Sequence, residues 1–234
     1  MSEPRDIIYG FRPVAEALRN PKRRPVLLLA SQNAAPRLAE EVPGLKIAPQ
    51  IIHPRELDRR LGPDAVHQGL LLEAEPLRQP RLDQVDKSGI IVLLDQVTDP
   101  HNVGAILRTC AAFGVSALVT TARHSPEATG VLFKSASGAY EHVPFVKITN
   151  LARAMEELKA SGFRIVGFDS EAPSRIEDID RAPPLALVLG AEGKGLRQLT
   201  RDTCDLVVRL DLPGPIKSLN VSNAAALALY ALTR

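Results

Sequence analysis

The chain has 234 residues, 45% of them hydrophobic, which is enough for one large domain or two modest ones with a real core. Trp is absent and aromatic residues make up 4%, so we expect an aliphatic core, and the net charge of +2 neither requires nor excludes a nucleic-acid partner. No apolar run approaches the roughly 20 residues of a membrane span, and the N-terminal stretch MSEPRDIIYGFRP has no signal-peptide core. These features predict a cytoplasmic protein without a membrane partner.

The two cysteines, Cys110 and Cys204, lie in apolar runs and belong to no CxxC or His-rich cluster. This pattern predicts two buried, reduced thiols and no metal site.

Residues 1–74 are predicted to form a small α/β domain. Helix patterns cover 10–20, 34–42 and 53–62, and strand patterns cover 24–31, 45–49 and 67–74. The basic cluster Lys22, Arg23 and Arg24 lies on a loop between a helix and a strand. It is either a solvated basic turn or a patch that contacts RNA phosphates.

Residues 75–88 are polar and carry prolines, so we interpret them as a linker. From 89 to 234 strands and helices alternate, which favours a parallel sheet covered by helices, an α/β fold. Strands are predicted over 89–97, 115–121, 163–169, 184–190 and 205–212. One helix is predicted after Asn150, its N-cap, and an Ala- and Leu-rich helix ends the chain.

Three strand ends in this second part carry polar or Gly-rich sequence, and ligands of parallel sheets bind at such ends. In the first, TDPHNVGAILRTC, Asn102 is well placed to cap a helix that begins at Val103. Arg108 stands among small and apolar residues of that helix, so it is either a surface residue with a snorkelling stem or a functional charge that needs a partner.

The second strand end, LGAEGKGL, places Glu192 and Lys194 among three glycines. Its GxxGxG spacing matches neither the P-loop nor the dinucleotide fingerprint, which disfavours an NTPase or a dehydrogenase. The third, KSLNVSN, sets polar residues at the mouth of the last helix. They could be an N-cap, a glycosylation site at Asn220 or part of an active site, and a cytosolic location removes the glycosylation interpretation.

Together, DPHNVGAILRTCAAFGV, LVLGAEGKGL and VVRLDLPGPIKSLNVSNAAALALY resemble, in order and spacing, the three motifs of the SpoU/TrmH class of SPOUT RNA methyltransferases. YGFRPVAEAL and HQGLL are similar to the small substrate-binding domain of the RlmB-type subgroup, whose shape is like that of ribosomal protein L30e. The resemblance covers essentially the whole chain. It implies an L30e-like domain over 1–74 and a SPOUT domain with a deep trefoil knot over 89–234.

The resemblance implies transfer of a methyl group from S-adenosylmethionine to a ribose 2′-hydroxyl of RNA by a homodimer. The implied substrate is a guanosine of large-subunit ribosomal RNA. The alternatives are another ribosomal nucleotide, a transfer RNA, or a non-catalytic RNA-binding assembly factor. The implied functional side chains are Asn102, Arg108, Glu192, Ser218 and Asn220. The implied cofactor contacts are Leu189, Gly190, Leu210, Ile216 and Leu219.

Because an arginine resists deprotonation, two roles stay open for Arg108. It is either a base helped by a neighbouring phosphate or a fixed cation that stabilises the developing alkoxide. Asn102 is expected to orient Arg108 or the ribose, and the polar residues of the other two motifs are expected to arrange the pocket.

Overall fold

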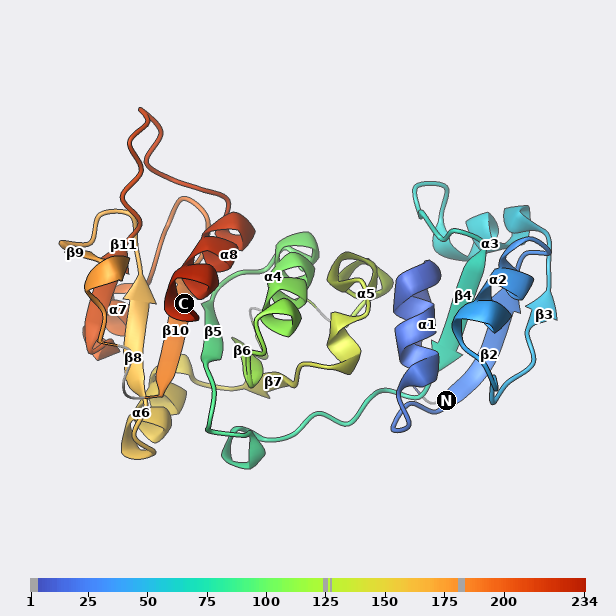
Figure 1. The fold of residues 1–234 in the computed structure, drawn as a ribbon, viewed down its shortest axis with the longest axis horizontal. Helices are drawn as coiled ribbons and strands as arrows, with labels where there is room; N and C mark the ends of the chain where they lie inside the picture. Colours follow the sequence, from blue (N-terminus) through green and yellow to red (C-terminus); the bar gives the residue numbers. More distant parts are fainter. Residues whose placement is uncertain (1–3, 124–125, 127, 181–183) are drawn as a thin grey trace. The chain divides into compact units, whose positions relative to one another are not determined.

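The structure is a computed structural model that describes residues 4–123, 126, 128–180 and 184–234. The chain separates into two compact units (Figure 1). Unit 1 consists of Met1–Arg78 and Glu127–His142, and unit 2 consists of Gln79–Pro126 and Val143–Arg234. The grouping of 127–142 with unit 1 differs from the predicted division, which kept all residues after 88 in one domain.

Unit 1 contains a four-stranded sheet with strand order β1-β4-β2-β3. β4 pairs antiparallel with β1 and β2, whereas β3 is parallel to β2. The elements from residues 4–78 are β1 (Asp6–Tyr9), α1 (Phe11–Arg19), β2 (Pro25–Ala30), α2 (Ala34–Glu41), β3 (Gln50–Ile51), α3 (Pro54–Leu61) and β4 (Leu70–Ala74).

The predicted strand over 45–49 is wrong, because the only strand in that region is β3. Leu45 and Ile47 alternate with polar residues for too short a stretch, and Pro49 lacks the N–H that a sheet ladder needs. β1 was not predicted, although its buried Ile8 and Tyr9 belong to the core.

The segment from α5 (Gly130–Ala136) to η2 (Ala139–Glu141) packs on β1 and α1. Gly130 permits the close approach, since a Cβ there would lie 2.5 Å from Cε1 of Tyr9. The buried rings of Phe133 and Tyr140 meet edge to face with their centroids 4.8 Å apart. This apolar packing explains why the segment belongs to unit 1 despite its place in the sequence.

Unit 2 contains a seven-stranded sheet with strand order β7-β6-β5-β10-β8-β11-β9, and its strand pairs are parallel. The α/β interpretation is therefore confirmed. The strands are β5 (Ile91–Asp95), β6 (Ala117–Thr121), β7 (Phe145–Ile148), β8 (Arg164–Phe168), β9 (Ser174–Arg175), β10 (Leu185–Gly190) and β11 (Leu206–Arg209). The helices are η1 (Leu82–Gln84), α4 (Pro100–Ala112), α6 (Leu151–Ala160), η3 (Ile176–Asp178), α7 (Gln198–Thr203) and α8 (Val221–Leu232).

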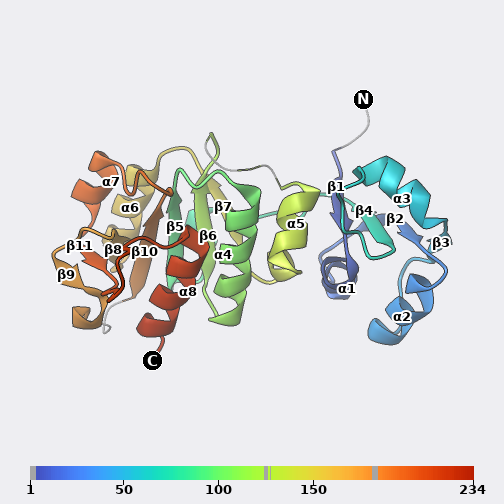
Figure 2. The same ribbon diagram turned by 90° about the horizontal axis from the view of Figure 1, so that it is seen from above.

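Helices cover both faces of this sheet. Figure 2 shows α4 and α8 on one face and α6 and α7 on the other, and each pair is in contact. Met155 and Leu158 of α6 belong to the same buried apolar cluster as Val188 of β10. As predicted, Asn150 caps α6 by accepting a hydrogen bond from the backbone N–H of Arg153 at 3.1 Å. Burial on both faces accounts for the continuous apolar runs of β5 and β10.

Candidate active site

The carboxyl ends of β5, β8 and β10 meet at one edge of the unit 2 sheet. Gly190, the last residue of β10, pairs with Asp95 at the end of β5, and Leu189 pairs with Phe168 at the end of β8. The loops that follow these strands therefore start side by side, which is where a parallel sheet places its ligands.

Three side chains from the three predicted motifs meet at this edge. The Nδ2 amide of Asn102 donates to Oε1 of Glu192 at 3.1 Å. The Nδ2 amide of Asn220 donates to the same oxygen at 2.5 Å and to Oδ1 of Asn102 at 3.0 Å. We call Asn102, Glu192 and Asn220 the polar triad. Asn220 and Glu192 are exposed and Asn102 is half-buried, so the triad is open to a ligand.

Asn220 also caps α8. Its Oδ1 accepts from the backbone N–H of Ser222 at 2.9 Å and from the Ser222 hydroxyl at 2.6 Å. The cap is therefore Asn220 rather than Ser222, and the same side chain serves both the helix and the triad. Glu192 strengthens this helix start, because its Oε1 accepts from the backbone N–H of Val221 at 3.3 Å.

Asn102 is not a helix cap, which corrects the prediction for the first motif. α4 begins at Pro100, and Asp99 caps it by accepting from the backbone N–H of His101 at 2.9 Å. Pro fits the first helical position because its missing N–H needs no partner there. Asn102 thus lies in the first turn, where its side chain is free to join the triad.

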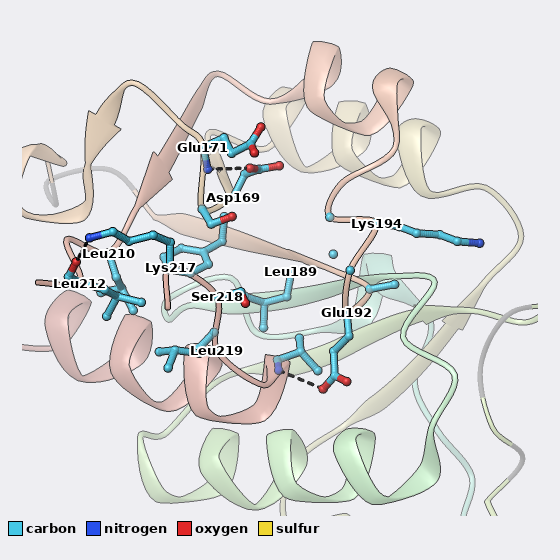
Figure 3. Close-up of a pocket in the computed structure, with 18 of the residues that line it drawn as sticks. Asp169, Glu171, Leu189, Glu192, Lys194, Leu210, Leu212, Lys217, Ser218 and Leu219 are labelled. Atoms are coloured by element: carbon cyan, nitrogen blue, oxygen red, sulfur yellow. Dashed lines mark hydrogen bonds between the residues drawn. The ribbon is translucent and has the colours of Figure 1, made fainter. Parts of the chain in front are cut away.

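A cavity of about 420 Å³ lies beside the triad, between the ends of β8 and β10 and the loop that leads into α8 (Figure 3). Its lining includes Glu192 of the triad and the predicted residues Leu189, Gly190, Leu210, Ser218 and Leu219. Ile216 does not line it. Ile216 is 73% exposed, and its implied contact with the cofactor stays a prediction.

The packing of the loop after β10 requires a glycine at position 190. A Cβ at this position would lie 2.3 Å from the carbonyl carbon of Gly195 and 2.6 Å from the amide nitrogen of Leu196. The glycine is therefore required by the loop that folds back over β10, where the N–H of Gly195 donates to the carbonyl of Ala191 at 2.9 Å.

The fully buried carboxylate of Asp95 anchors the far end of this loop. Its Oδ2 accepts from the backbone N–H of Arg197 at 3.0 Å, and its Oδ1 accepts from Nε of the same arginine at 2.7 Å. A buried charge needs such pairing. The loop that carries Glu192 is thus fixed at Gly190 by close packing and at Arg197 by this ion pair.

Several polar residues of the cavity lining were not predicted. Asp169 and Glu171 follow β8, Arg201 lies on α7, and Lys217 precedes Ser218. Asp169 pairs with Arg201 and accepts from the backbone N–H of Glu171 at 2.9 Å. The position of Asp169 directly after a buried strand was the available signal, because β8 neighbours β10.

Arg108 lies on α4, six residues after Asn102, and is exposed. Of the two alternatives left open for Arg108, the surface position is the one that the structure shows, because α4 buries Val103, Ile106 and Leu107 and turns Arg108 to solvent. Six residues advance a helix by about 9 Å, so Arg108 stands well along α4 from Asn102. It is not among the residues that line the cavity.

In unit 1, the prediction that Arg23 contacts RNA is wrong. Its side chain is 0% exposed, with Nη1 2.5 Å from Oδ2 of Asp6 and Nη2 2.6 Å from Oε1 of Glu141. Its guanidinium also lies over the ring of Phe133, 5.8 Å from the centroid. The neighbours Lys22 and Arg24 are exposed, and Arg24 lies 3.7 Å from Glu75. A contact of Lys22 and Arg24 with RNA stays a prediction.

Among the described residues, no three His, Cys, Asp or Glu side chains are grouped closely enough to hold a metal ion. Both cysteines are free; Cys110 is buried, and Cys204 is only partly so. Burial raises the pKa of the Cys204 thiol to about 12, and raises that of Cys110 further. In the described part of the chain, no helix has the length and apolar character needed to cross a membrane.

The sequence matches two family models. That of the SpoU rRNA Methylase family matches residues 89–230, and that of RNA 2′-O ribose methyltransferase substrate binding matches residues 7–80. The 23S rRNA (guanosine-2′-O-)-methyltransferase RlmB of Pseudomonas aeruginosa is 39% identical, and the match covers 97% of this chain and 95% of that protein. The putative TrmH family tRNA/rRNA methyltransferase YacO of Bacillus subtilis is 34% identical, with coverage of 100% and 97%.

Among solved structures, the SpoU methyltransferase AviRb of Streptomyces viridochromogenes in complex with AdoMet superimposes with a TM-score of 0.83. The two chains are 24% identical, and the match covers 98% of this chain and 89% of that one, which shows a shared fold. Because the family model spans most of the chain and a relative is 39% identical over nearly its whole length, this protein belongs to the SpoU rRNA methylase family.

Proposed function

We propose that this protein transfers a methyl group from S-adenosylmethionine to the 2′-hydroxyl of a guanosine in large-subunit ribosomal RNA. The observation that carries the proposal is the polar triad, in which three motifs meet beside a ligand-sized cavity. Support for guanosine and ribosomal RNA comes from relatives that bear this activity in their names. The intact triad argues against a non-catalytic assembly factor.

The cavity fits S-adenosylmethionine in size and chemistry. Its volume of about 420 Å³ lies within the usual range for small-molecule sites of roughly 300–1,000 Å³. Leu189, Leu210 and Leu219 supply apolar surface for an adenine ring, and the turn after Gly190 supplies backbone polar groups. When bound, the cofactor contributes a methyl group on a positively charged sulfur, and the protein must position the acceptor.

The triad would hold the substrate ribose. Oε1 of Glu192 accepts all three hydrogen bonds described above, and its Oε2 accepts none among the described residues. We infer that Oε2 is available to a ribose hydroxyl. The side chain of Asn102 is engaged with Glu192 and Asn220, which favours the role of orienting the ribose over that of orienting Arg108. Ser218 lines the cavity together with Glu192.

Arg108 is proposed to act on the 2′-hydroxyl from the partner subunit of a homodimer. Its exposed position away from the cavity fits that arrangement, because a residue that serves the partner's site must face outward. Leu227 and Tyr230 of α8 are each 44% exposed, and they supply apolar surface for such a dimer. At that site Arg108 would serve as a fixed cation or as a phosphate-assisted base.

The requirement for a 2′-hydroxyl selects RNA over DNA. Transfer RNA is the second candidate substrate, because relatives from several bacteria are named tRNA/rRNA methyltransferases. The match of residues 7–80 to a substrate-binding domain supports an RNA partner for unit 1. A ribosomal RNA substrate also fits the predicted cytoplasmic location.

The test is to map 2′-O-methyl groups on ribosomal and transfer RNA from cells with and without this protein. Loss of one methylguanosine from large-subunit RNA is expected, and purified protein with S-adenosylmethionine should restore it in vitro. Loss from transfer RNA alone would favour the second candidate, and unchanged methylation of both RNAs would overturn the proposal.

A further inference from the structure

Four side chains gather at the N-terminal end of α1 in unit 1. The guanidinium of Arg37 lies over the ring of Phe11, 4.9 Å from its centroid. Oε1 of Gln68 accepts from the backbone N–H of Phe11 at 2.9 Å and from the ammonium of Lys134 at 2.9 Å. We call Phe11, Arg37, Gln68 and Lys134 the Phe11 platform. Arg37 and Gln68 are exposed and the other two are partly exposed, so the platform is open to solvent.

The backbone around the platform adopts conformations that require a compensating contact. Gln68 has a φ of 54° although it is neither glycine nor asparagine. Residues held in that region cost about 1–3 kcal/mol and cluster at ligand sites. Gly10, with a φ of 93°, lets Lys134 approach the start of α1. A Cβ at position 10 would lie 2.6 Å from Nζ of Lys134. The strained residue Gln68 is exposed, so burial of its side chain does not offset the cost of its backbone conformation.

The positive charges of the platform are not neutralised by the protein. In the described part of unit 1, five of the ten arginines lie within 4 Å of a carboxylate, and Arg37 is not one of them: Arg5, Arg19, Arg23, Arg24 and Arg60. Arg37 and Lys134 form no ion pair within the described ranges. Cations left without a carboxylate beside an aromatic ring are suited to a polyanion whose bases can stack.

The amide of Gln68 has a defined orientation. Two N–H donors point at one of its terminal atoms, so that atom must be the oxygen. The Nε2 amide donates to no acceptor among the described residues, and the side chain is exposed. It can therefore donate to a carbonyl or ring nitrogen on the edge of a base.

We propose that the Phe11 platform binds an unpaired base of the substrate RNA. The base stacks on the guanidinium of Arg37, which Phe11 supports from below, and Gln68 donates to an acceptor on the base edge. Lys134 contacts an adjacent phosphate. The proposal rests on the proposed RNA substrate and gives unit 1 a recognition site of its own, one that favours single-stranded over duplex RNA.

The test uses the full-length protein and a fluorescein-labelled single-stranded oligoribonucleotide, with the same sequence as a duplex for comparison. The variants are Arg37→Ala, Arg37→Lys and Phe11→Leu, and the matched control is Arg60→Ala, which removes an exposed arginine from the same unit. Arg37→Ala should weaken single-strand binding about 10-fold, the usual loss for one stacked base. Arg37→Lys keeps the charge but should recover little, and the control should change binding less than about 2-fold.

Equal losses for Arg37→Ala and Arg60→Ala, or equal losses on single-stranded and duplex RNA, would overturn the stacking site. So would a change of oligomeric state on sedimentation, since the platform would then be a protein interface. Affinity for S-adenosylhomocysteine should be the same in all variants. If the wild-type protein methylates no RNA but the single-strand effect holds, the proposed function fails and the platform stands.

Discussion

The loop around Arg23 in unit 1 and helix α4 around Arg108 in unit 2 present two arginines in opposite environments. Arg23 belongs to a polar, basic stretch, yet its guanidinium is completely buried between two carboxylates. Arg108 belongs to an apolar helix, yet it faces solvent. Both alternatives for Arg23 assumed an exposed side chain and were wrong, whereas local composition left a surface position open for Arg108. Arg23 is buried because a distant segment supplies its partner Glu141. Arg108 is exposed because α4 packs on the sheet through its other face.

The largest effect is expected at Arg23. Arg23→Ala leaves Asp6 and Glu141 buried without their cation, which should lower the free energy of unfolding by about 3–5 kcal/mol. Arg24→Ala, one residue along, should change it by less than about 0.5 kcal/mol. Urea denaturation followed by circular dichroism measures both free energies of unfolding. Similar midpoints for the two variants would show that the buried ion pairs of Arg23 do not stabilise unit 1.

Arg108 should behave in the opposite way. Arg108→Ala should lower methyl transfer by about 10²–10³-fold, because it removes the charge that acts on the 2′-hydroxyl. The melting temperature and calorimetric affinity for S-adenosylhomocysteine should be unchanged. Arg153→Ala is the matched control, an exposed helical arginine of the same unit that pairs with Glu157. Near-normal turnover by the Arg108 variant would remove it from the reaction.

A smaller effect is expected at Asn220, which both caps α8 and belongs to the polar triad. Asn220→Ala loses the cap of α8, which is worth about 1 kcal/mol of stability, and also two bonds of the triad. Asn150→Ala loses a similar cap on α6, remote from the triad. Both variants should be similarly destabilised, but only the first should lose methyl transfer, by about 100-fold per folded molecule. Activity that follows the folded fraction in both would leave Asn220 as a cap alone.

Much of the fold of unit 2 could be predicted because continuous apolar runs such as those of β5 and β10 are long, buried and clearly bounded. Short elements could not, since β9 has two residues and is set by its neighbours in the sheet. The knot stays a prediction.

In the site, the resemblance named Asn102, Glu192 and Asn220, but their mutual hydrogen bonds join residues 28 to 118 positions apart and have no local signal. The start of α4 at Pro100 was missed because a longer polar turn was assumed.

The packing of residues 128–142 within unit 1 has a consequence for the order of folding during synthesis. Domains usually fold N-terminal first as the chain leaves the ribosome. Here the first unit cannot be completed until Glu141, the carboxylate that Arg23 requires, has emerged, by which time β5 and β6 of unit 2 have already been made. A fragment cut at residue 78 would lack that carboxylate and the rings of Phe133 and Tyr140. Unit 1 is thus completed by a segment that is encoded between two parts of unit 2.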